Sequence, residues 1–300
     1  MNPLHIFCNT AARSQAQNLF HCVEKESEET LTRLWTTNPE CEDMMTGLGS
    51  AGTKNKTQTA EARRVVENYI MNIPEDAMIF FTDSSALGNP GPCGAVAVCY
   101  IQGLKSQLVT LVEAVAPLST SYHGELMAIF LAIRFMIDSS AYKHCQKAYI
   151  LSDCQSAISS VCSQDIHKSH QRLIDNIKSD IQTLLERGLR ITLNWIAGHV
   201  SLQGNEQADH AAKIAAESAK DIPFREDTIS LSTLKGILKR QSKKRWQNMW
   251  RLSDNARRLY EWCPDVSKDK FPRIQKRGIE TKAVRLVTGQ TRLNKKMFDY

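Results

Sequence analysis

Apolar residues recur first in short runs of strand type and then with helical spacing between residues 76 and 221. Five strands are predicted, at residues 78–82, 94–100, 107–114, 147–151 and 190–196. Four helices are predicted between and after them, at residues 121–137, 155–162, 169–187 and 205–219. Because the first three strands are joined by short connections and the later strands alternate with helices, we expect an α/β fold: a mixed five-stranded sheet of three antiparallel strands followed by β-α-β units, flanked by helices.

The chain outside this stretch divides into two further parts. Residues 1–75 show weak periodicity, a Gly/Ser/Thr/Lys-rich stretch at 47–59 that is typical of a linker, and one amphipathic helix at 60–71. Beyond Pro223, a helix at 231–252 interleaves lysines and arginines with Leu238, Trp246 and Trp250. We therefore expect an N-terminal segment at 1–75 that is partly disordered or a linker, a folded domain at 76–221, and a basic helical tail at 222–300.

Composition and charge narrow the class of protein. With 42% hydrophobic residues in 300, the chain can bury a sizeable core, yet no stretch approaches the roughly 20 apolar residues of a membrane span and no signal-peptide core is present. We expect an intracellular protein, cytoplasmic or nuclear, with no membrane partner. Residues 222–300 carry 20 Lys/Arg against 8 Asp/Glu, whereas residues 1–221 carry 18 against 24. The basic tail therefore indicates an anionic partner such as nucleic acid.

The nine cysteines are scattered and form no Cys-x-x-Cys pair. This spacing predicts neither a disulfide framework nor a zinc site. Cys162, at the end of a helical pattern, is interpreted as a small buried hydrophobic residue in a reducing compartment.

Four acidic residues mark the places where predicted strands end or helices open. Asp83 follows the apolar run at 78–81, Asp153 follows the run at 148–151, Glu125 opens an apolar helix, and Asp209 lies in the last helix. Magnesium prefers hard oxygen ligands, and two ions about 3.5–4 Å apart can activate a water and stabilise a leaving oxygen. For any single acid, a helix cap or a favourable helix-dipole position is a competing explanation. Together the four predict a metal site that hydrolyses phosphodiesters.

The residues around these acids resemble ribonuclease H of type 1 over residues 76–220. The matching stretches are Thr82-Asp83-Ser84-Ser85, Gly88-Asn89-Pro90-Gly91-Pro92-Cys93-Gly94, Glu125-Leu126, Ser152-Asp153-Cys154-Gln155 and Gly198-His199, ten residues before Asp209. The resemblance implies a ribonuclease H-like fold and an endonuclease that hydrolyses the RNA strand of RNA–DNA hybrids, leaving 5′-phosphate and 3′-hydroxyl ends. It implies that Asp83, Glu125, Asp153 and Asp209 bind two Mg²⁺ ions, with Mn²⁺ as an alternative. It also implies that His199 assists proton transfer or product release.

The same resemblance assigns substrate contacts. Asn89 and Gln155 match residues that contact the RNA strand, and Ser121 precedes Glu125 where the family often carries asparagine. Turn chemistry alone also explains Asn89, because Asn-Pro-Gly-Pro forms a tight turn in any protein. Ser84 stands where the family usually has glycine.

The histidines other than His199 receive simpler interpretations. His123 lies two residues before Glu125 and is expected to support that carboxylate. His167, His170 and His210 are expected to be solvated.

The tail carries a second resemblance, to the region downstream of ribonuclease H in polyproteins of non-LTR retrotransposons. The matching stretches are residues 246–250 and 285–294. The alternative is a solvated basic helix whose tryptophans pack on the domain.

Two other functions stay open at this point. One is a catalytically silent, nucleic-acid-binding remnant of a retrotransposon. The other is a DDE-type transposase or Holliday junction resolvase, although neither needs the Asn-Pro-Gly-Pro turn together with the Gly-His loop. The leading hypothesis is a monomeric ribonuclease H that acts on RNA–DNA hybrid without an organic cofactor.

Overall fold

The computed structural model describes residues 40–42, 56–104, 106–139, 145–165, 169–198, 200–224, 229–254, 257–266, 278–279, 281–282 and 285. The chain divides into two compact units, Met1–Thr233 and Leu234–Tyr300, which are described separately. The strands of the first unit are β1 (Glu40–Glu42), β2 (Met78–Ala86), β3 (Gly91–Ile101), β4 (Ser106–Ser119), β5 (Lys147–Ser152) and β6 (Arg190–Trp195). Its helices are α2 (Lys56–Met71), α3 (Ser121–Asp138), α4 (Gln155–Cys162), α5 (Gln171–Glu186) and α6 (Gln203–Ser218).

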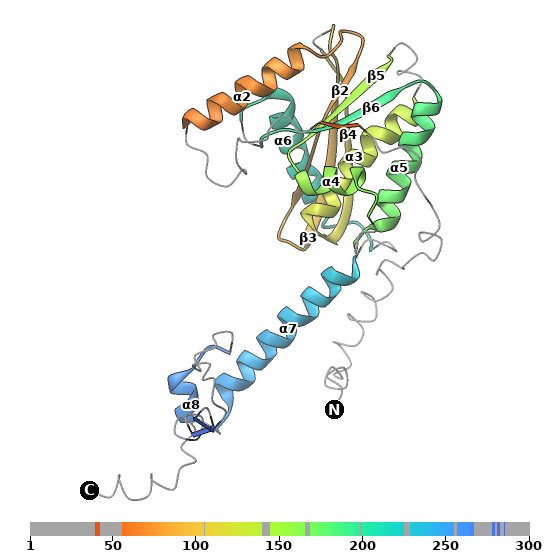
Figure 1. Cartoon of the computed structure of the whole chain (residues 1–300). Coiled ribbons are helices and arrows are strands. Elements are labelled where there is room, and N and C mark those ends of the chain that lie inside the picture. The colour runs from red at the N-terminus through yellow and green to blue at the C-terminus, as the bar shows by residue number, and fades with distance from the viewer. Residues whose placement is uncertain are drawn as a thin grey trace, which may run out of the picture. The chain divides into compact units, whose positions relative to one another are not determined.

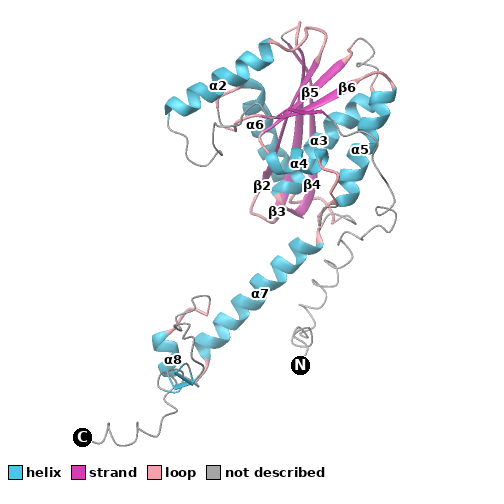
Figure 2. Ribbon diagram, viewed as in Figure 1, coloured by secondary structure: helices cyan, strands magenta, loops and turns pink. Residues whose placement is uncertain are grey.

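The strands form one mixed sheet in the order β1-β6-β5-β2-β3-β4. Strands β2, β3 and β4 are antiparallel, whereas β2, β5, β6 and β1 are parallel. Figure 2 shows this sheet as magenta strands between cyan helices. The predicted α/β fold with three antiparallel strands and following β-α-β units is therefore confirmed.

Helices cover both faces of the sheet (Figure 1). The ring of Phe80 lies 6.2 Å from that of Phe135 in α3. The next residue, Phe81, lies so close to Gly204 of α6 that a Cβ on this glycine would come within 2.3 Å of the ring. Because successive strand residues point to opposite faces, α3 and α6 pack on opposite sides of the sheet. The apolar runs of β2 and β5 are buried between these layers.

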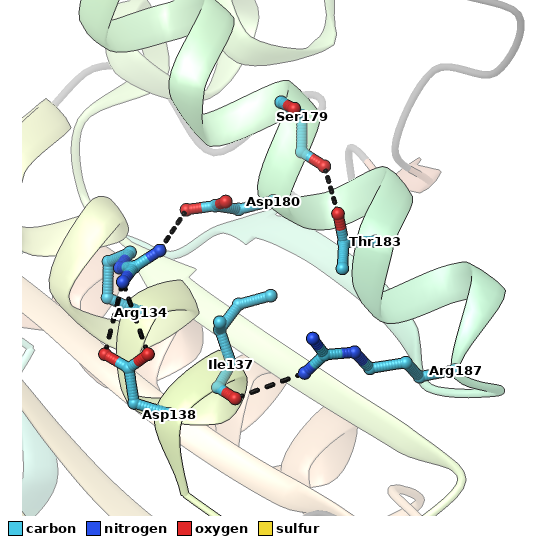
Figure 3. Close-up of polar contacts among 7 residues, drawn as sticks. All are labelled: Arg134, Ile137, Asp138, Ser179, Asp180, Thr183 and Arg187. Carbon is cyan, nitrogen blue, oxygen red and sulfur yellow. Dashed lines mark hydrogen bonds and ion pairs between the residues drawn. The ribbon is translucent and has the colours of Figure 1, made fainter.

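Polar contacts join α3 to α5 at the edge of this core. Arg134 of α3 lies 3.5 Å from the carboxylate of Asp180 and also pairs with Asp138 on its own helix (Figure 3). Arg187, directly after α5, donates a hydrogen bond to the carbonyl of Ile137 at 3.2 Å (Figure 3). These exposed contacts contribute little energy but fix the register of two helices that already share apolar surface.

Helix α2 precedes the predicted domain yet packs on its sheet. The ring of Tyr69 contacts Tyr149 of β5 edge-to-face, with centroids 6.1 Å apart, and Val66 is fully buried. Gln102 donates a 2.6 Å hydrogen bond to the carbonyl of Ile70. At least this part of the N-terminal segment is therefore folded onto the first unit.

The second unit holds most of α7 (Leu231–Leu252) and all of α8 (Arg257–Trp262). The indole of Trp250 donates to the carbonyl of Cys263 at 2.9 Å and contacts the ring of Tyr260. Arg257 lies over the same tyrosine ring, 4.3 Å from its centroid. One side of the end of α7 is thus occupied by the segment that follows it.

The sheet differs from the predicted one in two respects. A short sixth strand, β1, pairs in parallel with β6, and its three residues are too few to show an alternating pattern. Strand β2 extends past the predicted end at Thr82 because the antiparallel partner β3 continues the ladder to Ala86. Asp83 therefore lies within β2 rather than at its end.

Two side-chain interpretations are also wrong. His170 is buried, with 3% of its surface exposed, because it stacks against His123. Cys162 is disulfide-bonded rather than a free thiol. In the part of the chain that the structure describes, none of the helices combines the length and the apolar character needed to span a bilayer.

Candidate active site

Two aspartates approach each other at the end of the parallel ladder. Thr82 of β2 pairs with Ser152, the last residue of β5, so Asp83 and Asp153 are the first residues beyond that pair. Parallel strands bring their carboxyl ends to the same edge of a sheet. The indole of Trp195 donates to the carbonyl of Asp153 at 2.8 Å and so fixes the backbone where β5 ends.

Helix α3 supplies the third carboxylate. The helix opens at Ser121 with Thr120 as its N-cap, whose side chain accepts a hydrogen bond from the amide of His123. This start places Glu125 in the second turn, facing β2. The hydroxyl of Ser84 lies 2.7 Å from Glu125 Oε1, and the carboxylate is almost completely buried, with 7% of the residue exposed.

Ligand oxygens of Asp83, Glu125 and Asp153 all lie within 4.8 Å of one another. Burial raises the pKa of Asp83 to about 7, and the negative charge of Asp153 adds to the shift. Burial likewise raises the pKa of Glu125 well above its usual range, with the charges of Asp83 and Asp153 next in importance. Because Asp83 and Glu125 resist ionisation beside Asp153, the three form a site where a bound cation would replace protons.

The donor set fits a hard divalent cation. All three side chains offer carboxylate oxygens, which are the ligands that Mg²⁺ prefers. No cysteine or histidine belongs to this group among the described residues. Asp83, Glu125 and Asp153 are therefore the side chains that could hold Mg²⁺.

Asp209, the fourth predicted ligand, lies near this cluster but outside it. Its charge contributes to the raised pKa of Asp83, which shows that α6 brings it close. Its Oδ2 accepts a hydrogen bond from Lys213 at 2.6 Å, one helical turn further on, and its side chain is 28% exposed. The structure therefore brings three of the four predicted carboxylates together and leaves the fourth paired with a lysine.

The Gly-His loop reaches the same cluster at its glycine. A Cβ on Gly198 would lie 2.4 Å from Asp153 Oδ2, so only glycine leaves room for this carboxylate. His199, predicted to assist catalysis, lies outside the described residues.

Two predicted substrate-contact residues meet at a cavity beside the carboxylates. The side-chain amide of Asn89 donates to Ser121 Oγ at 3.3 Å, and both residues line a cavity of about 280 Å³. Ser230, Ser232 and Thr233 line the same cavity from the start of α7. Gln155, the third predicted contact, is the exposed first residue of α4.

His123 supports the helix rather than the carboxylate. Its Nδ1 lies 2.7 Å from Ser119 Oγ, and its ring stacks on that of His170 with centroids 4.1 Å apart and planes 4° apart. Burial lowers the pKa of both imidazoles, that of His170 to about 4. Two neutral rings therefore hold the start of α3 against the start of α5.

Some contributors to this site were missed or undervalued in the sequence. Lys213 follows Asp209 by four residues on a helix, a spacing that indicates an ion pair. Ser84, which departs from the family's usual glycine, bonds to Glu125 through its hydroxyl. The serines at 230 and 232 had no sequence signal, because their approach to Asn89 and Ser121 depends on tertiary structure.

Comparison with known proteins agrees with this geometry. The sequence profile of the family described as RNase H matches residues 75–217. Ribonuclease H of Blochmanniella pennsylvanica is 30% identical over 159 residues, which cover 49% of this chain and 94% of the relative. Ribonuclease H of Proteus mirabilis is 31% identical over 157 residues, covering 49% of this chain and 89% of the relative.

Solved structures with likeness to the chain include two ribonucleases H. The N-terminal RNase H domain of a Mycobacterium tuberculosis protein aligns with a TM-score of 0.39 at 20% identity, over 48% of this chain and 98% of that one. LC11-RNase H1 in complex with RNA/DNA hybrid aligns with a TM-score of 0.39 at 15% identity, over 47% and 98%. From the sequence relatives, the chain belongs to the ribonuclease H family and is a hydrolase of that kind.

Proposed function

We propose that the chain is an endonuclease that hydrolyses the RNA strand of RNA–DNA hybrids and leaves 5′-phosphate and 3′-hydroxyl ends. The observation that carries this proposal is the buried group of Asp83, Glu125 and Asp153 at the end of the parallel ladder of a ribonuclease H chain. The proposal includes action as a monomer.

In this proposal the site works with two Mg²⁺ ions, with Mn²⁺ as an alternative. When bound, such ions activate a water and stabilise the leaving oxygen. Asp83, Glu125 and Asp153 would hold them, and Asp209 would join by exchanging its pairing with Lys213 for the metal site. Ser84 keeps Glu125 oriented, and Gly198 leaves Asp153 free to face the cluster. His199 would assist proton transfer or product release.

The proposed substrate contacts are Asn89, Ser121 and Gln155. Support for the first two is their shared position on the cavity beside the carboxylates. Gln155 is exposed two residues after Asp153, within reach of a strand that lies over the site. A ribonuclease H must recognise 2′-hydroxyls and backbone shape rather than bases, and amide and hydroxyl side chains are suited to that.

The test is cleavage of an end-labelled RNA–DNA hybrid by the purified full chain, with Mg²⁺ and with EDTA. We expect cuts in the RNA strand only with Mg²⁺, and none in all-DNA or all-RNA duplexes of the same sequence. End-group analysis should give 5′-phosphate. Asp153→Asn is the control for a contaminating nuclease, since it should abolish the activity.

The alternative, a catalytically silent binding remnant, predicts a different result in the same experiment. It predicts hybrid binding in EDTA with no cleavage when Mg²⁺ or Mn²⁺ is added. The presence of all three acids favours an active nuclease over the silent remnant. Binding without cleavage across both ions would overturn the proposed activity.

We also infer an origin among ribonucleases H of non-LTR retrotransposons. The support is the tail, where residues 246–250 and 285–294 resemble the region downstream of that domain. Alignment of residues 222–300 alone with retroelement polyproteins tests this origin, and the lack of a match to the region downstream of their ribonuclease H domain would count against it.

A further inference from the structure

Helix α7 carries a one-sided set of charges. Its 22 residues contain seven lysines and arginines and no aspartate or glutamate. Lys235, Lys239 and Lys243 follow one another at intervals of four, so they lie in a row along the helix. Trp246, three residues after Lys243, continues the same row. We call Lys235, Lys239, Lys243 and Trp246 the basic ridge.

The ridge is exposed and, within the described part of the chain, unneutralised. All three lysines are exposed, and none of them forms an ion pair with a described residue. Helix α2 shows the usual arrangement on a solvated face, where Arg63 pairs with Glu67 four residues later at 2.7 Å. Like charges spaced by four residues destabilise a helix. The uncompensated row is therefore unfavourable unless an anion covers it.

The two tryptophans of α7 have different roles. Trp250 is held by the carbonyl of Cys263 and the ring of Tyr260, so it packs α8 against the helix. Trp246 is 55% exposed and lies among the cations. An exposed tryptophan beside a row of lysines can pack against the sugar–phosphate edge of a duplex that the lysines bind.

Residues 230–233, which lead into α7, belong to the first unit. Ser230 is buried, its hydroxyl accepts from the amide of Thr233 at 3.2 Å, and Ser232 Oγ lies 2.9 Å from Ser169 Oγ. These contacts anchor the start of α7 at the cavity that Asn89 and Ser121 also line. Lys235, the first ridge lysine, follows Thr233 by two residues.

We propose that the basic ridge binds the phosphodiester backbone of duplex nucleic acid and gives the nuclease a second contact with its substrate. The inference rests on the proposed function for the identity of the duplex. The nuclease domain at 76–221 carries 11 Lys/Arg against 14 Asp/Glu, so it does not attract a polyanion by net charge. From Lys235 to Lys243 the ridge covers about 12 Å, a length over which a duplex presents roughly seven phosphate charges.

The test is a salt titration of binding in EDTA, where no cleavage occurs. The full chain and the variant K235Q/K239Q/K243Q are compared on a labelled RNA–DNA hybrid, and glutamine is chosen because it preserves helix propensity. A plot of the logarithm of the association constant against the logarithm of the salt concentration has a negative slope. Loss of three phosphate contacts should make this slope shallower by roughly 2 to 3. It should also weaken binding at least about tenfold near 0.1 M salt. K235R/K239R/K243R should keep both values. Trp246→Ala should weaken binding with the slope unchanged, because it removes a contact without charge.

The matched control is R64Q/K147Q/K220Q, which removes three exposed cations that share no row. An equal loss of slope in this control would show that net charge, not the ridge, attracts the duplex. Wild-type slope in the ridge variant, with circular dichroism showing intact helix, would overturn the proposal. So would ridge-dependent binding to vesicles of anionic lipid without binding to duplex. The titration measures binding and not cleavage. It therefore tests the ridge even if the chain proves to have no nuclease activity.

Discussion

Two groups of like charge among the described residues differ sharply: the carboxylates Asp83, Glu125 and Asp153, and the lysines of the basic ridge. The carboxylates are enclosed between β2, β5 and α3, and burial raises the pKa values of Asp83 and Glu125 because a charge there is poorly solvated. The ridge lysines are exposed to solvent on α7. A buried cluster can select a small cation at short range, whereas an exposed row attracts a polyanion at long range and is sensitive to salt.

The comparison also separates two kinds of specificity. Positions in the carboxylate cluster are fixed by strand register, a capped helix and a serine hydroxyl, so a change of a few tenths of an ångström matters there. For the ridge lysines, charge and spacing matter more than exact position. Substitutions at the cluster should therefore change catalysis, and those on the ridge should change binding.

The largest effect is expected from Asp83→Asn. This change removes one ligand from the cluster and several kcal/mol of transition-state stabilisation, which corresponds to a loss of roughly 10³-fold or more in hybrid cleavage. Asp209→Asn should cost less, about 10- to 100-fold, because Asp209 is partly exposed and paired with Lys213. Single-turnover cleavage rates at saturating Mg²⁺ measure both.

Asp180→Asn is the matched control for that pair, because Asp180 of α5 pairs with Arg134 of α3 and does not belong to the carboxylate cluster (Figure 3). It should keep the wild-type rate. Undiminished cleavage by Asp83→Asn would show that the carboxylate cluster is not required for the reaction.

Strand and helix patterns predicted most of the fold because they depend on local periodicity. The predicted helices at 121–137 and 155–162 end within one residue of α3 and α4. The sequence also predicted which acids to consider, because their flanking residues match a known family. Asp83, Glu125 and Asp153 do come together, although their individual catalytic roles stay predictions.

What could not be predicted depends on contacts between distant residues. The burial of His170 follows from a stack with His123, 47 positions earlier in the sequence. Asp209 can either pair with Lys213 or join the carboxylate cluster. Spacing along the sequence does not show which of the two forms. Strand β1 is too short to produce a pattern and exists only because β6 offers a free edge.

The second prediction uses pH to distinguish the buried cluster from the rest of the molecule. The pKa of Asp83 is about 7 in the folded chain against an ordinary value of 3.8, so the folded state binds this proton more tightly. The resulting stabilisation is fully present below pH about 4 and is lost as the pH rises through about 7. Its size is on the order of a few kcal/mol.

Thermal unfolding in EDTA from pH 5 to 8 measures this effect. The melting temperature of wild type should fall by several degrees relative to Asp83→Asn, and Mg²⁺ should reduce the fall because it replaces the protons. The neutral imidazoles of His123 and His170 act with the opposite sign at low pH, but they are common to both proteins and cancel. If the melting temperatures of the two proteins change with pH in parallel, ionisation of Asp83 does not destabilise the folded chain.

The third prediction concerns the space that Gly198 leaves for Asp153. In Gly198→Ala the new Cβ would lie 2.4 Å from Asp153 Oδ2, so the carboxylate or the loop must shift. A misplacement of about 1 Å can cost roughly 10²-fold in rate. We expect a loss of that order in cleavage, with duplex binding in EDTA retained because the ridge is untouched.

The matched control is Gly236→Ala in α7, where an added Cβ meets no atom within 4 Å. It should cleave and bind as wild type does. If Gly198→Ala also cleaves normally, Asp153 has more freedom than the structure shows.

The smallest effect is expected from Ser84→Ala, which removes the hydroxyl that bonds to Glu125 at 2.7 Å. This hydrogen bond favours the ionised carboxylate, so its loss should raise the pKa of Glu125 further and make protons stronger competitors of the metal. A hydrogen bond contributes about 1 kcal/mol, which predicts a three- to tenfold rise in the Mg²⁺ concentration needed for half-maximal cleavage. The rate at saturating Mg²⁺ should change little, and the difference in Mg²⁺ requirement should shrink as the pH rises.

Ser85→Ala, one position away on β2, should leave the Mg²⁺ requirement unchanged. A slower rate at all Mg²⁺ concentrations would instead mean that Ser84 acts on the reaction itself rather than on the charge of Glu125.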